Sequence, residues 1–196
     1  MYEKVLSDFK VMGSPRIRRQ VQNVLGLINL SSNEKIMEIG VATGKFTSIA
    51  TRQNSVFAID IAFDNLQRAK RAVSEMGNIK NLFPLNADCS SMPFADSVFD
   101  KILAIDITEH LTDEIFFLLC KESYRVLKKD GSFFIYTPNL LHPYELARPF
   151  RPVLRKEHVG VRTRAKLCGF LKRAAFKIKR RYFNNCFRRI SIEAVK

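Results

Sequence analysis

A short apolar run that ends in a glycine-bearing turn constrains the fold of this chain more than any other feature. Residues 35–39 read Lys-Ile-Met-Glu-Ile, Gly40 and Gly44 bound the turn, and a helical pattern follows from 45 to about 53. A run of this length and composition is typical of a buried strand, and glycine adopts backbone conformations that other residues avoid. The pattern therefore predicts a strand, a tight turn and a helix in succession.

The alternation of strand and helix continues along the chain. Further strands are expected at 56–60, 82–87, 101–106, 132–137, 177–183 and 188–195. Helices are expected at 65–76, 112–128 and 164–174, the second ending at Asp130-Gly131. Alternating units of this kind are typical of a doubly wound, mostly parallel sheet. We expect one α/β domain over residues 1–196, built on a seven-stranded sheet.

Proline marks both ends of this framework. Ser14 and Pro15 suit the N-cap and the first position of a helix, so a lead-in helix is expected within residues 1–30. From Pro138 to about residue 155, four prolines interrupt the pattern. They predict a segment without regular elements.

The net charge of +14 is concentrated in the last quarter of the chain. Residues 145–196 hold 16 Lys and Arg against 3 Asp and Glu, whereas residues 1–144 hold 17 against 16. Charge runs are most often solvated faces, but this excess is larger than solubility requires. We therefore expect an anionic partner for residues 145–196, either RNA or a membrane surface.

Cysteine spacing and hydropathy indicate the cellular compartment of the protein. Cys89, Cys120, Cys168 and Cys186 are widely separated, so neither a disulfide framework nor a zinc site is indicated, and no metal is expected. The apolar stretches are far shorter than the roughly 20 residues that span a bilayer, and residues 1–10 are charged rather than signal-like. These observations predict a cytoplasmic protein with reduced, mostly buried thiols. They do not indicate an oligomeric state.

Ligands of an open parallel sheet bind beyond the carboxyl ends of its strands, where the strand order reverses. The turn from Glu38 to Gly44 follows the first strand, and Asp60 ends the next strand 22 residues after Glu38. A carboxylate there accepts two hydrogen bonds from a ribose diol, which indicates an adenosine-containing cofactor. Three residues rather than four separate Gly40 from Gly44, which excludes a Walker phosphate loop, and Ala42 breaks the dinucleotide-binding pattern Gly-x-Gly-x-x-Gly.

The remaining pattern, Glu-x-Gly-x-x-x-Gly, resembles the first motif of the class I S-adenosylmethionine-dependent methyltransferases. Several stretches are similar to the branch that includes quinone-biosynthesis and other small-molecule enzymes: residues 93–100, followed by 102–106 and 109–111, and residues 158–163. The chain departs from the family at Ala42, where a glycine is usual, and this departure bears on cofactor affinity. The resemblance implies a Rossmann-like sheet whose last strand runs antiparallel.

The resemblance also implies which residues bind S-adenosylmethionine. Gly40 and Val41 would contact its methionine part, and Asp106 would lie near the amino acid end. Asp60 and Ile61 would contact the ribose and adenine, and Asp88 the adenine edge. The other members of the predicted cofactor site are Glu38, Gly44 and Cys89.

We expect a methyltransferase that acts on a small or lipid-like, anionic acceptor. Segment 138–163 follows the fifth strand, where the family builds its acceptor pocket, and is a candidate lid. His110 is the candidate general base because its motif position is nearest the donor, although a structural role is commoner for a histidine. Two alternatives stay open: an RNA methyltransferase, and a non-catalytic module that binds nucleic acid or membrane through residues 145–196.

Overall fold

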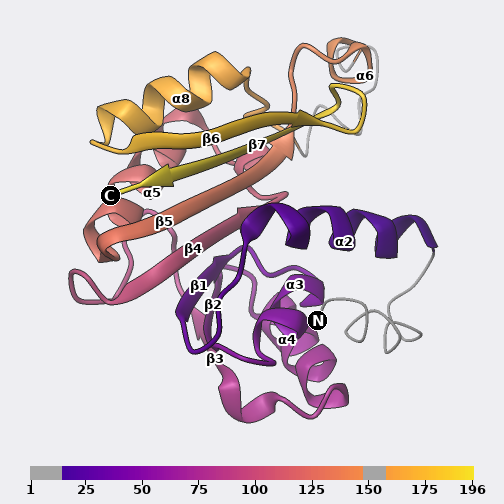
Figure 1. Ribbon diagram of the computed structural model, residues 1–196, viewed down its shortest axis with the longest axis vertical. Helices are drawn as coiled ribbons and strands as arrows, with labels where there is room; N and C mark the ends of the chain where they lie inside the picture. The colour runs from indigo at the N-terminus through magenta and orange to yellow at the C-terminus, as the bar shows by residue number, and fades with distance from the viewer. Residues whose placement is uncertain (1–14, 148–157) are drawn as a thin grey trace.

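The computed structural model describes residues 15–147 and 158–196, with side chains from residue 21 onward, and its centre is one seven-stranded sheet (Figure 1). The strands are β1 (Lys35–Ile39), β2 (Ser55–Asp60), β3 (Leu82–Asn86), β4 (Phe99–Ile105), β5 (Leu127–Pro138), β6 (Lys177–Asn184) and β7 (Arg189–Val195). Their order is β3-β2-β1-β4-β5-β7-β6. Strands β1 to β5 pair in parallel, and β7 is antiparallel to both β5 and β6. The predicted mostly parallel sheet with an antiparallel last strand is confirmed.

Three helices connect the parallel strands: α3 (Lys45–Ala50), α4 (Phe63–Glu75) and α5 (Asp113–Val126). Helix α2 (Pro15–Ile28) precedes β1, and α6 (Pro143–Leu146) and α8 (Arg164–Arg173) lie between β5 and β6. Short 3-10 turns are η2 (Ile79–Asn81) and η3 (Thr108–His110). Threonine begins two of the helices: Thr112 accepts a hydrogen bond from the amide of Ile115 in α5, and Thr163 accepts one from the amide of Lys166 in α8. The expected lead-in helix corresponds to α2.

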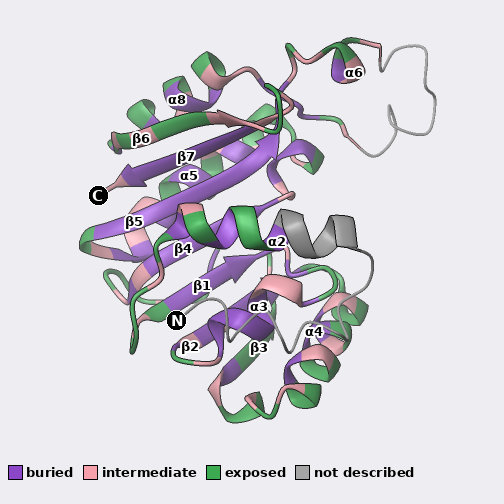
Figure 2. Cartoon of the chain, turned by 45° about the vertical axis from the view of Figure 1, so that its right-hand side comes forward, coloured by how far each residue is buried: buried purple, intermediate pink, exposed green. Residues whose placement is uncertain are grey.

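Successive side chains of each strand point to opposite faces of the sheet, and helices cover both faces. In β1, Ile36 packs in a cluster with residues of α2 and α3, whereas Met37 and Ile39 pack in the main core with residues of α5 and α8. Figure 2 shows that the central strands are buried, while β3 and β6 at the two edges carry exposed residues. The hydrophobic core therefore has two layers, one on each side of β1, β4 and β5.

The strand order reverses between β1 and β4. The chain turns from β1 toward β2 on one side, and β4 begins the other half of the sheet. The segments that follow Ile39 and Ile105 therefore leave the same edge of the sheet next to each other. This is the position at which open α/β sheets bind ligands.

Two expectations on element boundaries were wrong. The fifth strand begins at Leu127 rather than at residue 132, because Leu127 pairs with Phe99 before pairing resumes between Ser132 and Lys101. Asp130, with φ +63°, lies within β5 at the irregularity between these two pairings and not at a helix end. Pro143 does not interrupt regular structure but is the first residue of α6, where its missing amide hydrogen is not needed.

Several expectations fall partly or wholly outside the described residues. Residues 148–157, which belong to the candidate lid and to the basic part, lie in this gap. No helix among the described residues combines the length and the apolarity that crossing a membrane requires. Of the four cysteines, Cys120 and Cys168 are buried and Cys186 is exposed, and all four are free thiols.

Candidate cofactor site

The turn after β1 depends on the absence of a side chain at Gly40. This residue has φ +71°, and a Cβ there would lie 2.6 Å from Cγ1 of Ile107. Its amide donates a 2.9 Å hydrogen bond to the carbonyl of Ile59. Gly40 therefore lets the segments after β1, β2 and β4 approach closely.

Ala42 and Gly44 complete the turn in left-handed conformations. Ala42 has φ +45°, a left-handed backbone conformation that glycine adopts easily and alanine adopts only with strain. A Cβ on Gly44 would lie 2.5 Å from Cα of Ala69 in α4. Gly44 was predicted to bind the cofactor, but it is not among the residues that line the pockets described next. In this structure it packs the turn against α4.

Two pockets meet at Gly40. The Glu38 pocket has a volume of about 180 Å³ and is lined by Val21, Glu38, Gly40, Val41, Ala42, Thr43, Lys45, Phe46, Ile105 and Asp106. The Asp60 pocket has a volume of about 290 Å³ and is lined by Ile39, Gly40, Ile59, Asp60, Ile61, Ala87, Asp88, Cys89, Ile107, Leu111 and Ile115. Together they reach the size range of small-molecule sites.

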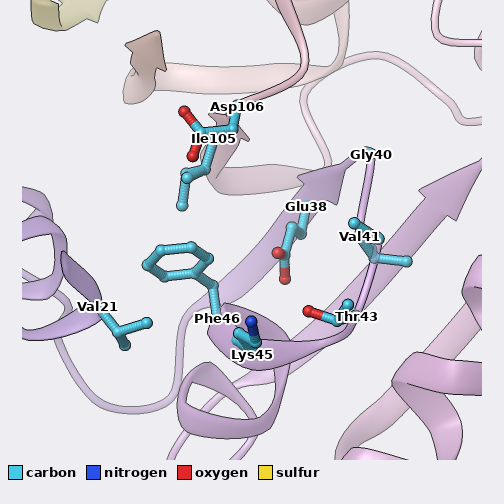
Figure 3. A pocket seen from close by; sticks show the side chains of 10 residues that line it. Val21, Glu38, Gly40, Val41, Thr43, Lys45, Phe46, Ile105 and Asp106 are labelled. Atoms are coloured by element: carbon cyan, nitrogen blue, oxygen red, sulfur yellow. The ribbon is translucent and has the colours of Figure 1, made fainter. Parts of the chain in front are cut away.

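The Glu38 carboxylate points into the first pocket, between the Phe46 ring and Val41 (Figure 3). Its side chain is buried, and among the described residues Oε2 has no hydrogen-bond partner. Burial raises the pKa of Glu38 to about 7, and the hydroxyl of Thr47 acts in the opposite direction. A buried carboxylate with an unsatisfied oxygen is suited to a cationic hydrogen-bond donor.

Asp106 lines the same pocket from the end of β4. Its φ is +52°, and its carboxylate forms an ion pair with the guanidinium of Arg189 at the start of β7. The sequence analysis placed Asp106 in the site but found no partner for it. Arg189 is brought there because β7 runs antiparallel, so that its first residue pairs with Pro138, the last residue of β5.

Asp60 is held rigidly in the second pocket. Its side chain is 8% exposed, Oδ1 accepts a 2.9 Å hydrogen bond from the amide of Ala62, and Oδ2 accepts a 3.1 Å bond from Nδ2 of Asn65. Each carboxylate oxygen can accept a second bond, so both remain available to a diol. Ile61, which follows, is 77% exposed and offers an apolar surface beside the carboxylate.

Asp88 and Cys89 lie on the far side of the Asp60 pocket. Oδ1 of Asp88 accepts a 2.8 Å hydrogen bond from the amide of Ser90, which is the geometry of an Asx turn. Burial raises the pKa of the Cys89 thiol to about 11, so this side chain acts as a neutral wall of the pocket. The predicted site residues after β2 and β3 thus line one pocket: Asp60, Ile61, Asp88 and Cys89.

The structure also reveals lining residues that the sequence analysis did not select. Ile107, Leu111 and Ile115 close the Asp60 pocket on the side of β4. Their spacing of four residues was the available signal, but it is equally typical of core residues. His110, the candidate base, lies between them at the end of η3, yet it lines neither pocket and its exposed ring packs edge-on against His158.

Comparison with known proteins shows the family of this chain. The methyltransferase domain family matches residues 37–135. A ubiquinone biosynthesis O-methyltransferase of Pelagibacter ubique is 30% identical over 140 residues, covering 70% of this chain and 50% of that protein. A phosphatidylethanolamine N-methyltransferase of Cereibacter sphaeroides is 29% identical over 124 residues, covering 62% of this chain and 56% of that protein.

Solved structures agree on the fold. A SAM-dependent methyltransferase from Aquifex aeolicus superposes with a TM-score of 0.74 at 17% identity, covering 96% of this chain and 97% of that one. The chain belongs to the methyltransferase domain family, and its sheet is the Rossmann-like sheet of these proteins. It spans between half and about three fifths of the length of the curated relatives named here.

Proposed function

We propose that this chain is a methyltransferase that binds S-adenosylmethionine across its two pockets and transfers the methyl group to a small or lipid-like, anionic acceptor. The observation that carries the proposal is the pair of buried carboxylates on either side of Gly40, Glu38 in one pocket and Asp60 in the other. They suit the two polar ends of this cofactor, an ammonium group and a ribose diol.

The residues present fit the proposed cofactor end to end. Asp60 would accept hydrogen bonds from the ribose hydroxyls, and the exposed face of Ile61 would pack against the adenine ring, with Asp88 at its edge. Glu38 would face the ammonium group of the methionine part. Asp106, already paired with Arg189, would contribute less charge to that end.

S-adenosylmethionine, when bound, supplies an electrophilic methyl group on a positively charged sulfur. The contribution of the chain is to position and enclose the reactants, which is the main source of acceleration in a displacement of this kind. Apolar residues after β4, Ile107 and Leu111, line the Asp60 pocket and would exclude water from the bound cofactor. His110 as general base remains a prediction, since its ring is exposed and lies beside His158.

The names of the relatives favour a small or lipid-like acceptor over RNA. They are a ubiquinone biosynthesis O-methyltransferase and a phosphatidylethanolamine N-methyltransferase, and both names contain a lipid-like molecule. The basic part of the chain supports negative charge on the acceptor without separating a lipid from RNA: Lys177 and Arg181 are exposed on β6, whereas Arg180 forms an ion pair with the buried Glu193. Segment 138–163, as the lid over the acceptor, belongs to the same proposal.

Methyl transfer from labelled S-adenosylmethionine tests the proposal. The protein would be incubated with vesicles of anionic phospholipid, vesicles of neutral phospholipid, a set of acidic phenols, and total RNA, each with Asp60→Asn as the inactive control. We expect label in an anionic lipid or small-molecule fraction, and its loss in the variant. Label in RNA alone would support the RNA alternative, and cofactor binding without transfer to any acceptor would support the non-catalytic module.

A further inference from the structure

Three potential ligand side chains meet outside the two pockets. Glu109 and His110 end the η3 turn, and His158 comes from the segment that leads into α8, 48 residues later in the sequence. One donor atom from each lies within 4.8 Å of the other two. Cysteine spacing indicates no metal, and only the fold brings His158 to the other two residues.

The backbone that carries these side chains is tightly fixed. The amide of Gly160 donates a 2.8 Å hydrogen bond to the carbonyl of Glu109. A Cβ on Gly160 would lie 1.8 Å from the carbonyl oxygen of Leu111, so only glycine allows this approach. The position of His158, two residues earlier, follows from this contact.

A buried arginine ties the same two segments together. Arg162 is 2% exposed, and its Nη1 donates to the carbonyls of Thr108 and Gly160 at 2.7 and 2.6 Å. Its Nη2 donates to the carbonyl of Leu111 at 2.8 Å, and its Nε pairs with Asp113 at 2.8 Å. One guanidinium thus holds the backbone on both sides of the cluster, which is how proteins pre-organise ligand side chains.

The donor set is that of a divalent transition-metal ion. Two imidazoles and one carboxylate bind ions such as Zn²⁺, Mn²⁺ or Fe²⁺ and leave positions open for water or another oxygen ligand. Bonds of about 2.0–2.2 Å place the donor atoms within about 4.2 Å of one another. His110 is the exposed member of the three, so we expect its side chain to move when an ion binds.

Arg189 is the nearby cation that could neutralise the Glu109 carboxylate in place of a metal ion. Its Nη1 lies 4.0 Å from Oε1 of Glu109, while Oε2 of Glu109 accepts a 3.1 Å hydrogen bond from Thr137. The guanidinium is closer to Asp106, with which it forms its ion pair. One carboxylate oxygen of Glu109 already lies within 4.8 Å of a ring nitrogen of each histidine.

We propose that Glu109, His110 and His158 form a binding site for one divalent transition-metal ion at the edge of the cofactor site. The site lies immediately after Asp106 and Ile107, which line the two pockets. Occupation of this site does not depend on methyl transfer.

Metal titration of tag-free protein, after treatment with a chelator and desalting, tests the proposal. Mn²⁺ and Zn²⁺ would be titrated by calorimetry, and bound Mn²⁺ counted by electron paramagnetic resonance. The variant is His158→Ala, and the matched control is His142→Ala, whose imidazole caps α6 and accepts a hydrogen bond from the amide of Tyr144. His110→Ala, at an exposed position, serves as the second variant should His158→Ala fail to fold.

We expect one ion per chain in the wild type and in His142→Ala, and at least a tenfold weaker affinity in His158→Ala or His110→Ala. S-adenosylhomocysteine would be titrated into the same samples, so that a failure of cofactor binding is seen separately. The proposal would be overturned if neither Mn²⁺ nor Zn²⁺ bound stoichiometrically. It would also be overturned if the wild type and the His110 and His158 variants bound the ions with equal affinity. Arg189 would then be the only cation that Glu109 requires.

Discussion

Gly40 holds a backbone conformation that a residue with a side chain adopts only with strain. We expect Gly40→Ala to lower the melting temperature and to abolish cofactor binding, because its Cβ would lie 2.6 Å from Ile107. Gly26→Ala is the matched control: it lies within α2, and nothing is within 4 Å of the added Cβ. Helix propensity predicts that this control gains about 0.5–1 kcal/mol. Thermal unfolding of both variants measures the difference, and equal effects would contradict the account.

Glu38 makes the stability of the free protein depend on pH. Because its pKa is raised from 4.5 to about 7 by burial, the folded state holds its proton more tightly than the unfolded chain. Stability contributed by the protonated form is complete below about pH 4.5 and is lost as the pH rises toward 7. We expect Glu38→Gln to raise the melting temperature of the free protein at pH 8 and to change it little at pH 5.

The same variant is expected to bind S-adenosylmethionine more weakly at pH 8, since an amide carries no charge for the ammonium group. Calorimetry at both pH values separates the two effects. A variant that is less stable at pH 8 and binds equally well would show that Glu38 has only a structural role.

Strand ends explain which site residues the sequence could predict. Glu38, Asp60 and Asp106 stand in or directly after strands whose carboxyl ends share one edge, so local pattern alone places them together. Arg189 and His158 carry no such signal, because their positions depend on the antiparallel course of β7 and on the packing of Gly160. Partners supplied by distant segments are fixed by tertiary structure and cannot be found from spacing.

The connection between η3 and the segment before α8 depends on Arg162 more than on any apolar contact described for it. A lysine cannot reproduce its four interactions, so Arg162→Lys leaves carbonyl groups of buried backbone without donors. We expect a loss of about 2–4 kcal/mol in the free energy of unfolding, measured in urea. Arg164→Lys, whose guanidinium lies 4.1 Å from the Phe183 ring, should cost about 1 kcal/mol or less. Similar losses in both variants would contradict this role.

The seven strands and the helices α2, α3, α4, α5 and α8 were predictable because hydrophobic periodicity reports directly on burial, whereas α6 was not predicted. The boundaries of β5 were not, because pairing of Leu127 with Phe99 is a contact between strands and leaves no trace in local pattern. Pro143 likewise suits both a break and a helix start, and His142 as the N-cap determines the outcome. Element boundaries thus depend on partners, whereas element types depend on the sequence itself.

The whole molecule combines a doubly wound arrangement of strands with an uneven distribution of charge. The order β3-β2-β1-β4-β5-β7-β6 places the cofactor turn at the reversal point, and the excess positive charge lies in the part of the chain that forms α8, β6 and β7. Within that part, Lys179 and Arg180 pair with Glu193, so part of the charge has a structural use. Lys177 and Arg181 are exposed and are among the residues that the proposed anionic acceptor would meet.

Calorimetric titration with S-adenosylhomocysteine, with Asp60→Asn as the test variant and Asp64→Asn as the control, is the most direct test of the central claim. Asp64 is an exposed residue in the first turn of α4, next to the site but outside both pockets. We predict micromolar binding by the wild type and the control, and binding about 10- to 100-fold weaker in Asp60→Asn, since a charged hydrogen bond contributes about 1.5–3 kcal/mol. Absence of binding by folded wild-type protein, or equal binding by Asp60→Asn, would contradict the cofactor assignment.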